Sequence, residues 1–254
     1  MLLKQITPVI LTYNEEPNIE RTLKKLDWAE RIVVIDSIST DATLDILVKY
    51  PKVDIFKRKF DSYAPQWNYG LDQVETDWIL SLDSDYVLPD ELIAEIAELN
   101  PEDSIDGYFA RFKYCVFGKP LRGTILPPRQ ILSRKGRSSY INDGHTQLLQ
   151  VVGDSGHLKN YIHHDDRKAL SRWLWAQDRY MLIEVDKLLN TPNNELSLGD
   201  RIRKRKVLAP LIILLYCLIL RGGILDGWYG CYYAFQRTFA EILLSLRLIE
   251  KEFR

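Results

Sequence analysis

The chain has 254 residues, of which 46% are hydrophobic and 27% charged, and its formal net charge is −1. This composition is typical of a globular protein and excludes disordered and low-complexity classes. The charge is unevenly divided, because residues 201–254 contain ten basic and four acidic side chains and carry +6, which leaves −7 for residues 1–200. A basic tail on an acidic body indicates a nucleic-acid or membrane partner for the tail.

The three cysteines are widely scattered and form neither a metal-ligand spacing nor a disulfide framework. The N-terminal residues lack the apolar core and cleavage site of a signal peptide. Together these features predict a cytoplasmic body.

The first hundred residues alternate short apolar runs with helical patterns. Strands are predicted at 6–12, 31–36, 53–57 and 78–82, and helices at 17–26, from the cap at 39–41 to about 49, and at 66–74. Buried strands separated by helices favour an open α/β fold with a parallel sheet covered on both faces. Such sheets bind ligands at the carboxyl ends of their strands, so the polar residues that follow each strand are candidates for a binding site.

Residues 101–165 have a different pattern, with an aromatic strand at 108–117 and a predicted hairpin over 146–163 that turns at 153–156. A helix is predicted at 167–190, ended by residues 191–194. Residues 107–142 contain eight basic side chains and no acidic one. A stretch of one sign indicates an anionic ligand such as a phosphate-bearing acceptor or a membrane surface. Nucleic acid is disfavoured, because the aromatic residues alternate as they would on the core face of a strand.

The last 54 residues combine a basic run at 201–206, an uncharged apolar run at 207–220 and an amphipathic helix from 228 to 249. The apolar run would span roughly 21 Å as a helix, short of the ~30 Å hydrocarbon core, so a transmembrane crossing is not expected. These three features predict helices that lie in the plane of a membrane. The alternative is that the same helices pack on the body of the protein or on a second copy of the chain, giving a homo-oligomer.

The sequence Leu-Asp-Ser-Asp at 82–85 ends the fourth predicted strand. Carboxylates two residues apart at a strand end can share a divalent cation, and their hard oxygens suit Mg²⁺ or Mn²⁺. Such a cation would neutralise a diphosphate and stabilise charge as it leaves. A solvated acidic turn is the alternative for Asp83 and Asp85, and a cap or turn role is the alternative for Asp36.

Four segments, in order, resemble the nucleotide-sugar half of family 2 glycosyltransferases: TYNEE at 12–16, VVIDSISTDAT at 33–43, APQWN at 64–68 and LDSDY at 82–86. The resemblance implies an inverting enzyme with the GT-A fold, a Rossmann-like nucleotide-binding sheet with an acceptor-side extension. Residues 1–100 would form the nucleotide-sugar half, 101–200 the acceptor half, and 201–254 a membrane-associating tail. Within the family, the chain is similar to bacterial enzymes that extend lipopolysaccharide cores and related cell-surface glycans.

The resemblance also implies roles for individual residues. The nucleotide-sugar would contact Thr12, Tyr13, Asn14, Glu15, Asp36, Gln66, Asn68 and Asp83. The metal would be held by Asp85, Asp83 and His164, although His164 could equally be a histidine that only forms hydrogen bonds. The acceptor or its phosphate would contact Arg122, Arg129 and Arg167.

An inverting transfer needs a base to deprotonate the acceptor hydroxyl. Relatives often carry a histidine followed by a glutamate near the acceptor, but this chain has a glutamine at position 147, which cannot serve as the base. Asp143 is therefore the first candidate, as a carboxylate on a glycine-containing turn at the acceptor side, and His145 is the second. An Asp-Gly turn is the structural alternative for Asp143. Tyr86 also departs from the family pattern, which often has an acidic residue there.

The resemblance thus implies transfer of a sugar from a nucleotide-diphosphate sugar, with UDP expected, to a lipid-linked or lipopolysaccharide-type acceptor at the cytoplasmic face of the inner membrane. The main alternative is a non-catalytic membrane-bound protein that binds sugar nucleotides. Nucleotidyl transfer is disfavoured, because residues 12–16 lack the glycines and basic side chains of a phosphate loop.

Overall fold

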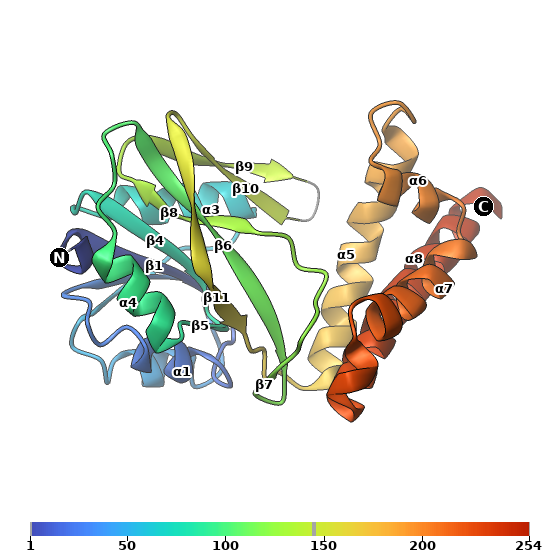
Figure 1. Ribbon diagram of the computed structural model, residues 1–254, viewed down its shortest axis with the longest axis horizontal. Coiled ribbons are helices and arrows are strands. Elements are labelled where there is room, and N and C mark those ends of the chain that lie inside the picture. Colours follow the sequence, from blue (N-terminus) through green and yellow to red (C-terminus); the bar gives the residue numbers. More distant parts are fainter. Residues whose placement is uncertain (1, 144–145, 254) are drawn as a thin grey trace. The chain divides into compact units, whose positions relative to one another are not determined.

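The computed structural model describes residues 2–143 and 146–253, and its internal contacts divide the chain into two units (Figure 1). Unit 1 comprises Met1–Cys115 and Leu126–Arg167, and unit 2 comprises Val116–Ile125 and Lys168–Arg254. Each unit is described by itself below. Residues 168–200, which the sequence grouped with the acceptor half, belong to the same unit as the C-terminal helices.

Unit 1 is built on a sheet whose first half is parallel, in the order β3-β2-β1-β4. These strands are β1 (Ile6–Thr12), β2 (Ile32–Asp36), β3 (Val53–Lys57) and β4 (Trp78–Asp83). The predicted strands are confirmed to within a residue, because uninterrupted apolar runs between turn residues are a strong signal. The carboxyl ends of all four strands meet at one edge of the sheet.

The sheet continues beyond β4 with mixed strand directions, in the order β8-β6-β11-β5. These strands are β8 (Arg129–Arg134), β6 (Ile105–Val116), β11 (Asp154–His164) and β5 (Tyr86–Val87). A separate hairpin joins β9 (Ser138–Asp143) to β10 (Thr146–Val151). The predicted hairpin over 146–163 is therefore wrong. β10 pairs with β9 while β11 runs parallel to β6, and the Gly153 amide binds Asp106 at 2.6 Å where the chain passes between the two sheets.

Successive residues of the buried strands point to opposite faces of the sheet. Ile10 and Val34 lie in a core that includes helices α1 (Ile19–Lys24), α2 (Thr43–Leu47) and α4 (Asp90–Glu98) and the short 3₁₀ helix η1 (Leu2–Gln5). Val9 and Val33 lie in a second core with α3 (Tyr63–Asp72) and the β9–β10 hairpin. Helices thus cover both faces, and the predicted α/β class is confirmed.

Unit 2 is helical apart from the two-residue strand β7 (Lys119–Pro120). Its elements are α5 (Leu170–Asn190), α6 (Leu198–Lys204), α7 (Leu208–Leu215), the π-helical turn η2 (Tyr216–Leu220), the 3₁₀ turn η3 (Gly223–Asp226) and α8 (Trp228–Phe253). Leu188 of α5 packs with Leu244 and Leu248 of α8 in its core. None of the helices within residues 2–143 and 146–253 combines the length and apolarity needed to cross a lipid bilayer.

The amphipathic helix expected at 228–249 is present as α8, and its apolar face, which includes Phe235 and Phe239, is largely exposed. The unexpected finding is on the opposite face, where the polar residues Glu241 and Ser245 are buried together with Leu244 and Leu248. Glu241 is accommodated in the interior because Arg203 donates hydrogen bonds to both of its carboxylate oxygens, at 3.0 and 3.2 Å.

Candidate active site

Asp36, the last residue of β2, is a buried carboxylate whose oxygens are occupied by its neighbours. Thr12 Oγ1 donates to it at 2.8 Å, the Ser39 amide at 2.9 Å and the Ser39 hydroxyl at 2.6 Å. The side chain is 0% exposed. Asp36 therefore holds the loop after β2 against the end of β1, which is the structural alternative that the sequence left open.

The loops after β1 and β2 are joined by side chains that bind backbone amides. The Asn14 amide donates to Ser39 Oγ at 2.9 Å, and the Glu15 amide donates to Thr43 Oγ1 at 2.7 Å. In return, Asn14 Oδ1 accepts from the Thr40 amide at 2.8 Å. Asn14 has a φ of 54°, a conformation that asparagine tolerates better than most residues. Tyr13 is left with its side chain 44% exposed at this edge.

The turn after β4 places two carboxylates around a buried serine. Ser84 donates its hydroxyl to the Leu11 carbonyl, and its own carbonyl accepts from Thr22 Oγ1 at 2.7 Å. Because Ser84 is fixed inward, Asp83 and Asp85 on either side of it are half-buried rather than enclosed. The Asp-Ser-Asp spacing thus presents both carboxylates at the same edge of the sheet.

Strand pairing brings His164 to this turn from 79 residues away in sequence. His164 lies opposite Tyr86 in the antiparallel pairing of β11 with β5, and the Asp165 amide donates to the Asp85 carbonyl at 2.9 Å. His164 Nε2 lies 3.0 Å from Asp85 Oδ2. The imidazole is positioned by the rings of Tyr86 and Tyr114, whose centroids are 5.3 and 5.1 Å away.

The electrostatics of this cluster favour an added positive charge. Burial raises the pKa of Asp83, and the negative charge of Asp85 raises it further. Burial opposes protonation of His164, but the neighbouring Asp85 outweighs it and raises the pKa of the imidazole. Arg129, also subject to burial, has its pKa raised by Tyr86 and Asp83. A carboxylate pair whose ionisation is resisted in this way is one that a cation would stabilise.

The three predicted metal ligands are neighbours, but they do not surround an empty centre. Within the described parts of the chain, no three His, Cys, Asp or Glu side chains are arranged as a ready metal site. Asp85 is hydrogen-bonded to His164 instead. The donor set of two carboxylates and one imidazole suits Mn²⁺ or Mg²⁺, and His164 Nδ1 has no hydrogen-bond partner among the described residues. The residues therefore fit a divalent cation that would replace the Asp85–His164 hydrogen bond.

Asn18 connects the loop after β1 to the segment that follows His164, and sequence analysis missed it. Its side-chain nitrogen donates to Glu15 Oε2 and Asp166 Oδ1, both at 2.9 Å, and its oxygen accepts from the Arg167 amide at 2.8 Å. Asn18 is 0% exposed. An asparagine at the start of a helix is usually a cap, and here it makes no capping hydrogen bond, so local pattern alone gave no signal of this role.

Two residues that were predicted to contact the nucleotide-sugar, Gln66 and Asn68, make hydrogen bonds within the protein. Asn68 donates to the Tyr140 carbonyl at 3.0 Å and accepts from its amide at 2.7 Å, which fastens the β9–β10 hairpin to α3. Gln66 is buried and accepts from Arg58, while its nitrogen donates to Ser37 Oγ at 3.1 Å. These bonds place Gln66 beside the end of β2 and Asn68 beside the hairpin.

The predicted acceptor arginines are divided between the two units. Arg129 lies in unit 1 near Asp83 and Tyr86, and Arg167 makes two hydrogen bonds to Asp165, at 2.7 and 2.9 Å. Arg122 belongs to unit 2, where it pairs with Asp226 at 3.3 Å.

The two base candidates lie at the tip of the β9–β10 hairpin. Asp143 ends β9, where its backbone pairs with Thr146. Its side chain is outside what the structure describes, and His145 lies outside the described residues altogether.

Comparison with known proteins finds glycosyltransferases among the relatives. An uncharacterized glycosyltransferase of Rickettsia bellii is 32% identical over 111 residues, which cover 43% of this chain and 37% of the relative's length. The chain thus spans well under half of that relative. The lipopolysaccharide core biosynthesis glycosyltransferase LpsC of Rhizobium meliloti is 22% identical over 253 residues, covering 91% of this chain and 89% of LpsC.

Solved structures share the fold at low identity. The mannosyltransferase PcManGT of Pyrobaculum calidifontis, in complex with GDP-Man and Mn²⁺, has a TM-score of 0.55 and 11% identity, covering 96% of this chain and 87% of that chain. TarS 1–349 of S. aureus, in complex with UDP-GlcNAc, has a TM-score of 0.51 and 14% identity, covering 97% and 92%. The model of the family described as Glycosyl transferase family 2 matches residues 7–159, more than half of the chain. The chain therefore belongs to glycosyl transferase family 2.

Proposed function

We propose that this chain transfers a sugar from a nucleotide-diphosphate sugar, with UDP as the nucleotide, to a lipid-linked or lipopolysaccharide-type acceptor, with inversion at the anomeric carbon. The observation that carries the proposal is the grouping of Asp83, Asp85 and His164 at the carboxyl edge of a parallel sheet. Ligands of open α/β sheets bind at this edge. Support for the acceptor class comes from the likeness to LpsC, which extends over nearly the whole chain.

Asp85 and His164 would hold the divalent cation, Mn²⁺ or Mg²⁺, with Asp83 beside it. When bound, the cation neutralises the diphosphate and stabilises its charge on leaving. PcManGT, which shares the fold, has been solved with Mn²⁺. The aromatic rings around His164 hold the imidazole in one orientation and limit access of water to it, which pre-organises the site before donor binds.

The loop of residues 12–16 would bind the nucleotide with its backbone and with the exposed ring of Tyr13. Its conformation is fixed by Ser39 and Thr43, which accept from the Asn14 and Glu15 amides. Asp36 acts in this proposal through Thr12 and Ser39, whose positions it fixes. The loop is thus already in one conformation before nucleotide arrives, which lowers the entropic cost of binding.

The acceptor hydroxyl must lose a proton as it attacks the anomeric carbon in line with the leaving diphosphate. Asp143 remains the first candidate for this base and His145 the second. Asp143→Asn and His145→Ala, assayed side by side, assign the role to whichever substitution removes transfer without weakening donor binding.

The proposal is tested by incubating the protein with a panel of labelled UDP-, GDP- and TDP-sugars, Mn²⁺ and a bacterial lipid extract. Label from a UDP-sugar is expected in the lipid phase, and chelation of the metal is expected to stop its transfer. Asp85→Asn should lower the rate by at least about 100-fold, whereas Asp45→Asn, which changes an exposed carboxylate of α2, should leave it unchanged. Full activity of Asp85→Asn would overturn the metal site, and nucleotide binding without turnover would favour the non-catalytic alternative.

A further inference from the structure

One end of unit 2 is built by unusually close packing of backbone segments. This end consists of residues 116–125, η2, η3 and the start of α8 (Figure 1). A Cβ at Gly230 would lie 1.9 Å from the Gly223 carbonyl oxygen, and one at Gly123 would lie 2.2 Å from the Arg221 carbonyl oxygen. Only glycine fits at these positions, so the segments are locked together by their backbones and form a defined surface.

Backbone amides of residues 116–125 bind side chains of η3 and α8 at this end. The Arg122 amide donates to Asp226 Oδ2 at 2.9 Å, and its guanidinium lies 3.3 Å from Asp226 Oδ1. The Ile125 amide donates to the Tyr233 hydroxyl at 3.1 Å. Asp226 is the only acidic residue in the segments 116–125 and 216–232, and it is buried. No exposed carboxylate is therefore contributed by these two segments.

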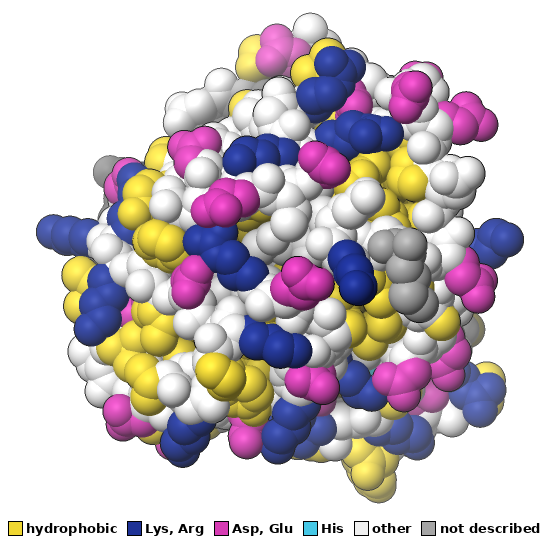
Figure 2. Space-filling view, turned by 90° about the vertical axis from the view of Figure 1, so that its left-hand side faces the viewer, with side chains coloured by type: hydrophobic (Ala, Val, Ile, Leu, Met, Phe, Trp, Pro, Cys, Tyr) yellow, Lys and Arg dark blue, Asp and Glu magenta, His cyan; other side chains and the backbone are white. Residues whose placement is uncertain are grey.

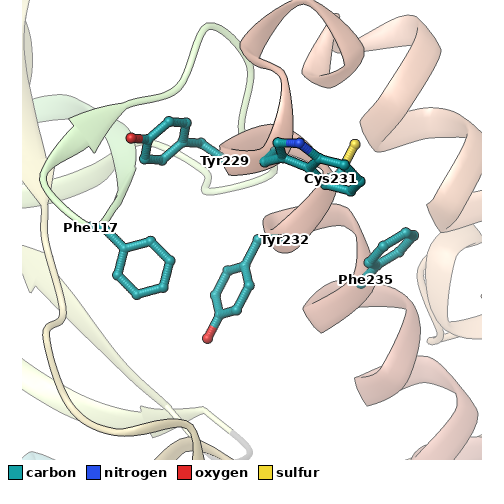
Figure 3. Close-up of a pocket in the computed structure, with 6 residues that line it drawn as sticks. Phe117, Tyr229, Cys231, Tyr232 and Phe235 are labelled. Atoms are coloured by element: carbon teal, nitrogen blue, oxygen red, sulfur yellow. The ribbon is translucent and has the colours of Figure 1, made fainter.

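The outer surface of this end is apolar. We define the aromatic tip by six side chains that are between 62% and 83% exposed: Phe117, Ile219, Leu220, Ile224, Leu225 and Trp228. Two of these side chains also line an open hollow of about 430 Å³ (Figure 3). Its lining residues are Phe117, Trp228, Tyr229, Cys231, Tyr232 and Phe235. Single exposed apolar residues need no explanation, but a rigid group of large ones indicates a binding surface.

Three basic side chains lie in the same segments as the aromatic tip. Lys119 Nζ lies 4.7 Å from the centre of the Tyr229 ring, and the Arg221 guanidinium lies 5.3 Å from that of Tyr216. Arg122 is also exposed over most of its length. By contrast, Figure 2 shows a face of the molecule where charges of both signs are interspersed. Exposed aliphatic and aromatic side chains, in segments that carry exposed basic side chains and no exposed acidic one, are complementary to a bilayer surface with anionic headgroups.

We infer that the aromatic tip is the surface by which this chain docks on an anionic lipid membrane, with Trp228, Leu225 and their neighbours in the interface and Lys119, Arg122 and Arg221 at the headgroups. The inference deepens the proposed function and rests on it for the membrane-bound acceptor. It places a membrane contact outside the basic run at 201–206. In that run Arg203 is paired with Glu184, Asp200 and Glu241 and Lys206 with Glu252, whereas Arg201 and Arg205 are exposed.

The test is co-sedimentation of the full chain with vesicles of phosphatidylcholine alone and of equimolar phosphatidylcholine and phosphatidylglycerol. The wild type is expected to bind the anionic vesicles, and the double variant Leu225→Ser/Trp228→Ser to bind at least about 10-fold more weakly. The matched control is Leu198→Ser/Phe253→Ser, which removes two equally exposed apolar side chains elsewhere in unit 2. Circular dichroism of both variants checks that they fold.

Equal vesicle binding by wild type and the tip variant would overturn the inference. So would light scattering that finds a lipid-free dimer which the tip variant dissociates, because the occupant would then be a second copy of the chain. Binding is measured without donor or acceptor. Wild type that binds vesicles but transfers no sugar therefore counts against the proposed function. Wild type that transfers sugar but does not bind vesicles counts against the docking surface.

Discussion

The loop of residues 36–43 after β2 and the turn of residues 83–86 after β4 leave the same edge of the sheet, and each carries two carboxylates. In the first loop, Asp36 and Asp41 accept hydrogen bonds from hydroxyls and amides of their own loop and its neighbour. In the turn after β4, burial and mutual repulsion raise the pKa of Asp83, and Asp85 contacts a histidine. Carboxylates of the first kind stabilise a loop, and those of the second kind are suited to a ligand.

Asp83→Asn is expected to have the largest effect of the substitutions that test the difference between the carboxylates of the two loops. Sugar transfer is expected to fall by at least about 100-fold, because a neutral amide holds a cation poorly. In the same variant, the denaturant midpoint measured without metal is expected to rise, since the substitution removes a half-buried charge that repels Asp85. A lower midpoint would show that Asp83 is a structural carboxylate like Asp36.

Asp36→Asn is the matched substitution in the other loop, and it should change stability in the opposite direction. The amide nitrogen cannot accept the bonds that one carboxylate oxygen takes from Thr12 and Ser39. A loss of about 1–3 kcal/mol in the free energy of unfolding is expected, as for other charge-assisted hydrogen bonds. Urea denaturation measures it, and an unchanged midpoint would contradict the assigned role.

Asn18→Ala tests whether the loop after β1 and the segment after His164 act together. The substitution leaves Glu15, Asp166 and the Arg167 amide with fewer partners, so a stability loss of roughly 2 kcal/mol is expected. If Asn18 also positions the site, kcat should fall about 10-fold, as small misplacements near a reacting centre do.

The control for Asn18 is Asn160→Ala, which removes the hydrogen bonds that the Asn160 side chain donates to Glu95 and to the Glu91 carbonyl in unit 1. It should lower stability slightly and leave kcat unchanged. Equal effects of the two variants on kcat would reduce Asn18 to a purely structural residue.

Asp41→Asn is expected to have the smallest effect, and that effect should depend on pH. Burial raises the pKa of the Asp41 carboxyl, but hydrogen bonds from Thr43 and Glu16 outweigh it and hold that pKa below its usual value. A carboxyl whose pKa is lowered by folding stabilises the fold at pH values above its pKa in the unfolded chain. This contribution is lost as the pH falls through its pKa in the folded protein. The difference from wild type should therefore be under about 1 kcal/mol near neutral pH, because Asp41 is partly solvated, and should vanish in acid. A difference that grew on acidification would contradict the assignment.

The parallel half of the sheet could be predicted from sequence because each of its strands is an uninterrupted apolar run, such as Ile32–Asp36. The second half could not, since β11 joins β6 in parallel across some forty intervening residues and no local pattern encodes that pairing. The same pairing decides where His164 lies. Its position next to Asp85 was expected only from the family resemblance.

The roles of single polar residues were harder to predict than the strands. Asn68 and Asp36 have side chains that suit nucleotide binding or structural hydrogen bonds equally well, and their structural bonds depend on the positions of Tyr140 and Ser39, which the sequence does not reveal. Asn18 was missed because its partners lie as far as 149 residues away. The burial of Glu241 in α8 was not predicted for a related reason, since its charge is paired with Arg203, which lies 38 residues away in the sequence.

The contact between Gly223 and Gly230 gives a way to recognise other chains that share the aromatic tip. Exposed side chains such as Trp228 or Ile224 can be exchanged for other large apolar residues without disturbing the backbone beneath them. The two glycines cannot be exchanged, because any side chain at position 230 would meet the Gly223 carbonyl and one at position 223 would meet the Cys217 carbonyl. Their seven-residue separation, followed by an aromatic helix, is therefore a better search pattern for this surface than the residues that form it.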